Sequence, residues 1–412
     1  MKSTSVSNNM RWLYLTAAVL TLMCTGSIYA FSVFSGPLAL ERGWTVAQVT
    51  LAFTINTAVC PIPMILAGRF VDRGYARASM MIGGCLFGLA FLIIAYLPSL
   101  SALYLGYGVL GGVGISLAYA GALGNVTRYF PDKRGLATGL VTAGNGAAAL
   151  ITAPLAASLI ASGGVISALR ILGIGFFTVA LVCGLVTKTA PSGFRPSGWT
   201  PPQTDSKADA SLRWSGMIAT PVFYLLLVLM ASGAMSGLMI AANASQIGQN
   251  MFHISAAVAA GCVGLYAASN ATGRFFWGAV SDRIGGANTL IAIFALVAAM
   301  LGVLASSSSF AGFVIGLCGI GLGFGGVMGV FPSIVAARFG VKYFGENYGI
   351  MFCGYATAAF LGPRLGASMA ALNGGDFTKA FYVAILVCVL GLGLALVLRS
   401  VTARPRPAVP GA

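Results

Sequence analysis

Twelve apolar runs dominate this sequence, and each is about as long as a membrane-spanning helix. Crossing the hydrocarbon core of a bilayer takes roughly 20 mainly apolar residues in helical conformation. The runs cover residues 12–36, 47–68, 78–97, 102–124, 137–161, 167–188, 217–243, 255–280, 287–306, 310–335, 346–371 and 377–399. Because a backbone in lipid must satisfy its own hydrogen bonds, the pattern predicts an all-α membrane protein with twelve transmembrane helices.

The composition favours a lipid environment over an aqueous one. The chain is 58% hydrophobic and only 8% charged, whereas soluble domains are about a quarter charged. A formal net charge of +15 would suit a nucleic-acid partner, but the basic residues lie in short segments between the apolar runs. We therefore expect the lipid bilayer to surround this chain, and we expect no nucleic-acid partner.

The Lys and Arg residues also predict the orientation. Of the 23, 18 fall on the side of the N-terminus, three fall on the opposite side (Arg42, Arg170 and Lys379), and Arg274 and Arg364 lie within spans. Positive charge marks the cytoplasmic side, so both termini are expected there, in a multi-pass plasma-membrane protein of the bacterial inner-membrane type. The first run lacks the short apolar region and the small-residue cleavage site of a signal peptide, so we interpret it as span one.

One long polar stretch divides the chain. Residues 189–216 are rich in Pro, Ser and Asp, a composition typical of a flexible linker. The predicted organisation is an N-terminal six-helix half (1–188), a cytoplasmic linker (189–216), a C-terminal six-helix half (217–399) and a cytoplasmic tail (400–412).

An internal repeat supports this division into halves. A Gly-x-x-x-Asp-Arg motif closes both span two and span eight at an offset of 210 residues, and its six residues are Gly68, Asp72, Arg73, Gly278, Asp282 and Arg283. The same offset relates Gly135 to Gly345 and Gly139 to Gly349. Duplicated halves with a substrate site at their interface are a recurring plan of secondary transporters.

Arg274 is a cation well inside span eight. Insertion scales assign roughly 2.5–3.5 kcal/mol to such a residue, so it is expected to face a cavity, a partner or a charged ligand. All 8 acidic residues are placed in loops or at span ends, which leaves no intramembrane acid as partner. Asn270 and Tyr266 lie four and eight residues earlier on a similar helix face, so the three predict a carboxylate site. The alternative is that Arg274 packs against carbonyls or extends to the interface.

Five further residues are candidates for the wall of the same cavity: Tyr29, Tyr119, Asn145, Phe331 and Tyr355. Aromatic surfaces with a few polar groups suit a small anion with a short apolar part, and ordinary packing is the alternative. Arg364 lies nine residues after Tyr355 and therefore on the opposite side of one helix. It is expected to reach the outer headgroups, or otherwise to attract anions as a second cation.

Catalytic, metal and cofactor sites are not expected. The 8 Cys residues are scattered through apolar runs without metal-ligand spacing. We identify no catalytic constellation, so the predicted class is not an enzyme.

These motifs together resemble the major facilitator superfamily. Arg128-Tyr-Phe-Pro-Asp-Lys-Arg-Gly-Leu-Ala-Thr-Gly139, followed by Ala143-Gly144-x-Gly146, is similar to the span-five signature of oxalate/formate antiporters and monocarboxylate transporters. Arg42-Gly43-Trp44 and Gly329-Val-Phe331-Pro332 also fit the oxalate/formate antiporter family. The resemblance implies a small carboxylate substrate, and it implies that the Gly-x-x-x-Asp-Arg motifs help to hold the inner gate.

The resemblance also assigns expectations to single residues. Arg274 matches a carboxylate-binding arginine of both families, and Tyr29 and Tyr119 align with aromatic positions of the antiporter. Asn270 stands where many monocarboxylate transporters have a proton-coupling aspartate. Tyr355 stands where the oxalate antiporter has a lysine, which favours a monoanion.

The sequence therefore predicts a monomeric secondary transporter working by alternating access. The expected substrate is a monocarboxylate of lactate or formate size, exchanged for a counter-anion or coupled to protons. The alternatives are an oxalate-type dicarboxylate antiporter and a neutral-solute or drug transporter in which Arg274 is structural. An anion channel and a metabolite sensor are less consistent with one asymmetric arginine and short loops.

Overall fold

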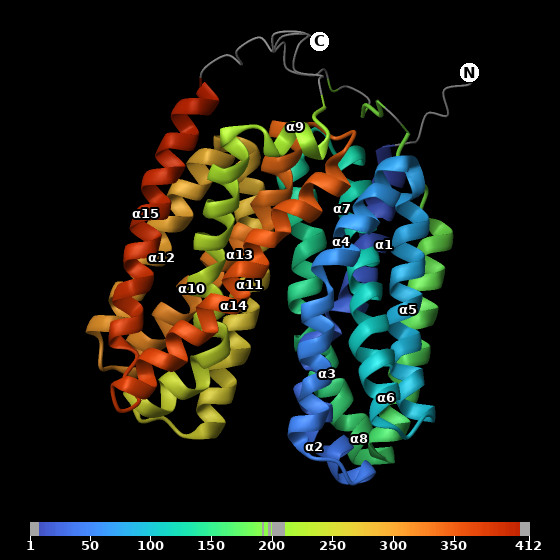
Figure 1. The fold of residues 1–412 in the computed structure, drawn as a ribbon, viewed down its shortest axis with the longest axis vertical. Helices are drawn as coiled ribbons and strands as arrows, with labels where there is room; N and C mark the ends of the chain where they lie inside the picture. The colour runs from blue at the N-terminus through green and yellow to red at the C-terminus, as the bar shows by residue number, and fades with distance from the viewer. Residues whose placement is uncertain (1–7, 192, 197–198, 200–210, 404–412) are drawn as a thin grey trace.

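The structure is a computed structural model that describes residues 8–191, 193–196, 199 and 211–403. The middle of the predicted linker (200–210) and residues 404–412 of the predicted tail lie outside the described residues. The described part of the chain is helical and contains no strand. Its helices form two groups that stand side by side. The first described helix begins, and the last one ends, at the same end of the molecule, which we call the end that bears the termini (Figure 1).

The first group runs from α1 to α8. Its elements are α1 (Asn8–Gly26), the 3₁₀ turn η1 (Ser27–Ala30), α2 (Ser32–Arg42), α3 (Val46–Val59), α4 (Pro61–Phe70), the π-helical η2 (Val71–Tyr75), α5 (Ala76–Tyr96), α6 (Leu100–Ala102), the π-helical η3 (Leu103–Leu110), α7 (Gly111–Tyr129) and α8 (Arg134–Val186).

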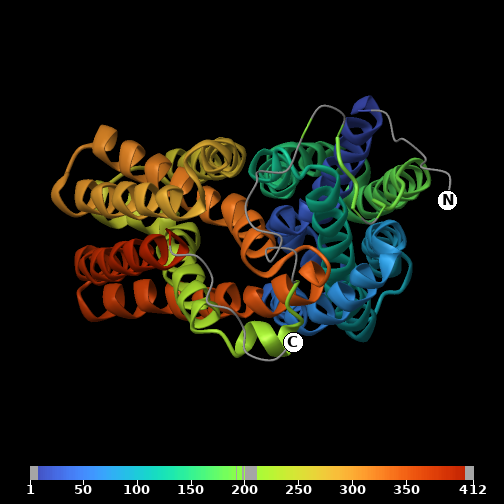
Figure 2. The same ribbon diagram turned by 90° about the horizontal axis from the view of Figure 1, so that it is seen from above.

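The second group follows the short helix α9 (Trp214–Ile218). It contains α10 (Pro221–Phe252), α11 (Ala256–Ile284), α12 (Gly286–Ser306), α13 (Phe310–Phe339), α14 (Phe344–Leu372) and α15 (Thr378–Ala403). Seen from the end that bears the termini, the two groups remain distinct, with α10–α15 on one side and α1–α8 on the other (Figure 2). We call them the N-half and the C-half.

The predicted spans do not each coincide with one helix. The first is interrupted by η1, and the second is divided at Pro61, whose missing N–H suits the start of α4. In contrast, α8 has 53 residues and would extend about 80 Å if straight, far more than one crossing. Gly164 has φ +79° and interrupts α8, so predicted spans five and six lie on either side of this reversal.

Serine and threonine side chains begin several helices. In the capping box of α3, Thr45 Oγ1 accepts the Gln48 N–H at 3.2 Å while Gln48 Oε1 accepts the Thr45 N–H at 2.9 Å. Ser99, Thr220, Ser255 and Ser309 likewise accept a backbone N–H three residues ahead. These caps supply partners for amides that a helix start leaves unpaired.

Eight helical stretches among the described residues are long and apolar enough to cross a membrane. Both α11 and α14 have 29 residues but are more polar than these eight. Each contains one of the two intramembrane arginines, Arg274 and Arg364. Both helices also pack against the opposite half, because α11 contacts α8 and α14 contacts α4.

The two halves meet at one end and separate at the other. Contacts of α8 with α11 and of α4 with α14 join them at the end that bears the termini, and the helix groups diverge toward the opposite end (Figure 1). Arg274 lies on α11 where this helix faces α8.

Candidate functional site

Arg274 is buried between the halves, with only 5% of its surface exposed. Its Nε donates a hydrogen bond of 3.0 Å to Asn270 Oδ1 on the same helix, as the spacing of four residues predicts. Its Nη1 donates to the carbonyl oxygen of Thr142 on α8 at 2.6 Å. No acidic side chain is a hydrogen-bond or ion-pair partner of Arg274 among the described residues. The guanidinium charge is therefore held by neutral acceptors only.

Two glycines of α8 make room for this arginine. A Cβ on Gly146 would lie 3.0 Å from both Cζ and Nε of Arg274. A Cβ on Gly139 would collide with the Arg274 carbonyl oxygen. Larger residues at these positions would push α8 away from α11, so the close approach of the halves at Arg274 depends on glycine.

Four tyrosine hydroxyls lie within electrostatic reach of the Arg274 charge, and they belong to Tyr119, Tyr266, Tyr348 and Tyr355. Three of these tyrosines surround Phe352 of α14. The ring centroid of Phe352 lies 6.0 Å from that of Tyr119 on α7, 6.0 Å from that of Tyr348 and 4.7 Å from that of Tyr355. Because Tyr119 belongs to the N-half, this aromatic cluster spans both halves beside Arg274.

Three hydrogen-bond donors near Arg274 lack a protein acceptor. The hydroxyls of Tyr119 and Tyr348 lie close to each other across the two halves, but their contact does not meet the geometry of a full hydrogen bond, and neither has another partner among the described residues. The buried Asn270 Nδ2 also has no acceptor among the described residues. Burying an unsatisfied polar group costs about 1–3 kcal/mol, so such groups are found where a ligand or water completes them. An uncompensated cation surrounded by unsatisfied donors suits an anion.

The other predicted residues are placed differently. Tyr29 in η1 is 47% exposed and interacts with Tyr355. Tyr266 is buried, and its hydroxyl donates to the Gly237 carbonyl on α10 at 2.6 Å. Asn145 ties α8 to α1 through a 3.4 Å hydrogen bond from Nδ2 to the Leu22 carbonyl. Phe331 is fully buried in α13. The last three therefore have packing partners in this conformation, and their contact with substrate remains a prediction.

Sequence reasoning missed Tyr348, Phe352 and the Thr142 carbonyl. The two aromatic residues lie seven and three positions before Tyr355, so the helical period would have placed them near the same face. The carbonyl of Thr142 is a backbone group, and no sequence pattern identifies it.

Arg364 is exposed near the far end of α14. Its Cζ lies 3.6 Å from the ring centroid of Phe360, one turn away, in a cation–π contact. Because Arg364 and Tyr355 lie nine residues apart in the one helix α14, their side chains leave it on opposite sides.

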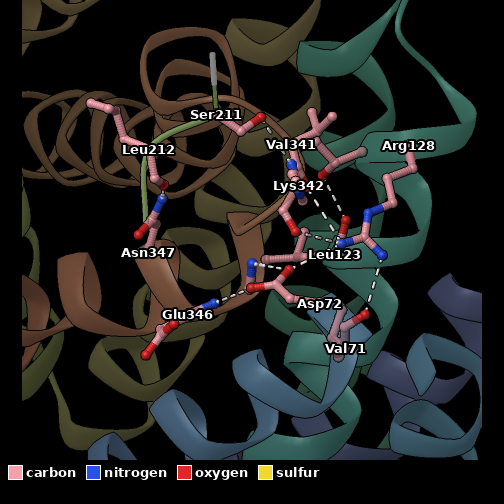
Figure 3. A network of polar contacts seen from close by, with 12 residues as sticks. Val71, Asp72, Leu123, Arg128, Ser211, Leu212, Val341, Lys342, Glu346 and Asn347 are labelled. Atoms are coloured by element: carbon pink, nitrogen blue, oxygen red, sulfur yellow. Dashed lines mark hydrogen bonds and ion pairs between the residues drawn. The ribbon is translucent and has the colours of Figure 1, made fainter. Parts of the chain in front are cut away.

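The two Gly-x-x-x-Asp-Arg motifs make equivalent contacts across the halves. Asp72 accepts the backbone N–H groups of Gly345 and Glu346 at the start of α14, at 3.0 and 2.9 Å (Figure 3). Asp282 accepts those of Gly135 and Leu136 at the start of α8, at 2.7 and 2.9 Å. Each carboxylate thus caps the first helical turn of the opposite half, where the helix dipole favours negative charge.

The motif glycines allow this approach. A Cβ on Gly68 would collide with the backbone of Gly345, and a Cβ on Gly278 would collide with that of Gly135. In contrast, Arg73 and Arg283 are exposed, and neither has a hydrogen-bond or ion-pair partner among the described residues. Within these two motifs, the contact across the halves therefore comes from the Gly and Asp positions.

Comparison with known proteins agrees with this architecture. The family model of the Major Facilitator Superfamily matches residues 15–285 and 226–412. A solved transporter of that superfamily, FucP in the outward conformation, has a TM-score of 0.70 at 14% identity, covering 93% of this chain and 99% of that one. This likeness bears on the fold alone.

Curated relatives include two named transporters. The oxalate:formate antiporter of Oxalobacter formigenes is 30% identical over 404 residues, 96% of this chain and 92% of its own length. Human monocarboxylate transporter 11 is 39% identical over 135 residues, 33% of this chain and 27% of its own length. The chain therefore belongs to the Major Facilitator Superfamily as a multi-pass membrane transporter related to the oxalate:formate antiporter.

Proposed function

We propose that the protein transports a small organic anion, a monocarboxylate of lactate or formate size, across the membrane. One observation carries this proposal: the buried Arg274 has no acidic partner among the described residues, and the polar groups of Tyr119, Tyr348 and Asn270 near it are buried without a well-formed hydrogen bond to a described residue. A carboxylate has two acceptor oxygens that a guanidinium binds through parallel hydrogen bonds. The neighbouring hydroxyls would then complete its remaining acceptor sites.

The charge of the site favours a monoanion. Arg274 is the one cation of the described aromatic cluster, since position 355 is tyrosine and Arg364 lies elsewhere on α14. The second carboxylate of a dicarboxylate substrate would have no cationic partner in this cluster. The name of the 30% identical relative nevertheless supports a second candidate, exchange of a dicarboxylate such as oxalate for formate.

Transport would follow from the position of Arg274 between the halves. The carboxylate would displace the Thr142 carbonyl from Nη1, which weakens one hydrogen bond between α11 and α8. With both termini cytoplasmic, the present structure would be open toward the outside. Rocking of the halves would then separate the contacts at Asp72 and Asp282 and release the substrate on the other side. Anion exchange agrees best with a site that contains no proton-accepting carboxylate.

Uptake into proteoliposomes tests this function. Labelled lactate, formate and oxalate would be offered to vesicles that are empty, preloaded with unlabelled anion, or given an inward proton gradient. Stimulation of lactate or formate uptake by preloading is the expected result. Stimulation by the proton gradient alone would indicate symport, and preference for oxalate would favour the second candidate. Absence of saturable uptake of all three anions would contradict a small-carboxylate transporter.

A further inference from the structure

A second cationic cavity lies at the end of the molecule that bears the termini. Its volume is about 650 Å³, and five basic residues line it: Arg73, Arg128, Arg134, Arg195 and Lys342. Asp72 is the one acidic residue in its wall. Both Asp72 oxygens already accept backbone N–H groups of α14, and Oδ1 also pairs with Arg128 Nη2 at 3.0 Å. The cavity therefore has a strong excess of positive charge.

Both halves contribute to this cavity. Arg128 at the end of α7 and Arg134 at the start of α8 belong to the N-half, while Lys342 follows α13 in the C-half. Arg128 Nη2 already lies 3.4 Å from the carbonyl oxygens of Val341 and Lys342 (Figure 3). An occupant would therefore contact the N-half and the C-half together.

The segment between the halves forms another wall. Pro191, Phe194, Arg195 and Trp199 line the cavity. Two of its described residues contact the N-half: Asn125 Oδ1 accepts the Ala190 N–H at 2.8 Å, and the Phe194 ring lies 5.1 Å from that of Tyr129. Arg195 thus directly follows a residue, Phe194, that packs against α7 of the N-half.

Arg134 has unused hydrogen-bonding capacity in this wall. Its Nε is buried and has no hydrogen-bond partner among the described residues. The Arg134 charge interacts with the carboxylate of Asp282. In contrast, Arg73, Arg195 and Lys342 are exposed and make no hydrogen bond or ion pair with an acidic side chain among the described residues. Several guanidinium groups around one volume match the oxygens of phosphate groups, which accept bidentate hydrogen bonds. A monocarboxylate would neutralise only one of these cations and would fill little of the volume.

We propose that this cavity binds a water-soluble polyvalent phosphate that bridges the two halves. The site is distinct from the Arg274 cluster, and it does not depend on the identity of the transported anion. Because the ligand contacts both halves in this conformation, its binding favours the conformation in which they are closed at this end.

The test is calorimetric titration of the full-length protein in phosphatidylcholine nanodiscs with sodium tripolyphosphate at fixed ionic strength. The wild type is expected to bind one equivalent saturably. Removal of two exposed cations in Arg195→Gln/Lys342→Gln is expected to weaken binding by about tenfold or more. The matched control is Lys133→Gln, because Lys133 is adjacent to Arg134 but lies over the Trp12 ring and outside the cavity. It is expected to keep the wild-type affinity within about twofold.

Two results would overturn the proposal. One is a failure of specific binding in the first experiment. Either the wild type shows no saturable binding, or Lys133→Gln weakens binding as much as the double substitution does, which would indicate general charge attraction. The other comes from nanodiscs that contain phosphatidylglycerol, where tripolyphosphate binding is expected to persist. Its complete loss there would assign the cavity to a lipid headgroup instead.

Discussion

Arg274 on α11 donates a 2.6 Å hydrogen bond to the backbone carbonyl of Thr142 on α8, so the intramembrane cation itself joins the two halves. A bound carboxylate would compete for the same Nη1 group. In this account, substrate binding and loosening of the interface are therefore one event.

The donor pattern around Arg274 predicts a specific effect of Asn270→Asp. The new carboxylate would lie at the position of Asn270 Oδ1, 3.0 Å from Arg274 Nε, and would compete with the substrate for the guanidinium. We expect KM for lactate or formate to rise by about tenfold or more at pH 7, because pairing with Arg274 keeps the new carboxylate ionised.

The control for this change is Asn270→Ala, which removes the amide without adding charge. It is expected to raise KM less, because it adds no negative charge beside Arg274. Initial uptake rates between pH 5 and 8 provide the measurement. Equal effects of the two substitutions at every pH would contradict direct competition for Arg274.

Two tyrosines are predicted to respond in opposite ways to removal of the hydroxyl. Tyr119 has no acceptor among the described residues, so Tyr119→Phe should leave the thermal midpoint unchanged or higher while weakening substrate binding about three- to tenfold. Tyr266 donates to the Gly237 carbonyl, so Tyr266→Phe should cost about 1 kcal/mol of stability with a smaller effect on KM. Thermal unfolding and uptake of each purified variant would be compared. The reverse pattern would place the substrate nearer to Tyr266.

The interface at Asp72 predicts a pH-dependent conformational equilibrium. Burial raises the pKa of Asp72 to about 6, although the amides of Glu346 and Gly345 and the charge of Arg128 act in the opposite direction. Asp72 lies between predicted spans two and three, and in the open state it would be hydrated with an ordinary pKa of about 4. Asp72 thus binds a proton more tightly when the halves are in contact at this end (the closed state) than when they are apart. Acidification through pH 6 therefore stabilises the closed state, and this stabilisation is lost as the pH rises above 6.

Spin labels at positions 75 and 213 in a cysteine-free background would report this equilibrium. Position 75 belongs to the N-half, and position 213 follows Leu212, whose N–H donates to the Phe339 carbonyl of the C-half at 2.9 Å. The short-distance population is expected to increase from pH 7.5 to pH 5. Asp72→Asn should reduce this dependence, because position 72 then no longer titrates. An unchanged distance distribution across this range in the wild type would contradict the role assigned to Asp72.

Local spacing predicted part of this site. The interval of four residues placed Asn270 beside Arg274, and the interval of nine residues separated Arg364 from Tyr355, because both follow from helical geometry. The contacts between the halves could not be predicted from spacing in the sequence. Asp72 binds amides 273 and 274 residues later, and the sequence motif does not indicate which helix start a carboxylate will cap.

The internal division of the spans was also beyond the apolar pattern. Hydropathy is similar on both sides of Pro61 and of η1, so a continuous run concealed two helices in spans one and two. Likewise, Tyr29 and Tyr355 were predicted as separate candidates, and only the folded chain brings them into contact.

The central claim is that Arg274 binds the transported carboxylate, and counterflow into proteoliposomes preloaded with unlabelled anion tests it most directly. Arg274→Lys retains the charge but loses the planar fork that grips two oxygens. We expect lactate or formate counterflow to fall by about 100-fold or more, with a thermal midpoint close to wild type. Counterflow by correctly folded Arg274→Lys and Arg274→Ala with wild-type KM would contradict the claim and assign Arg274 a structural role.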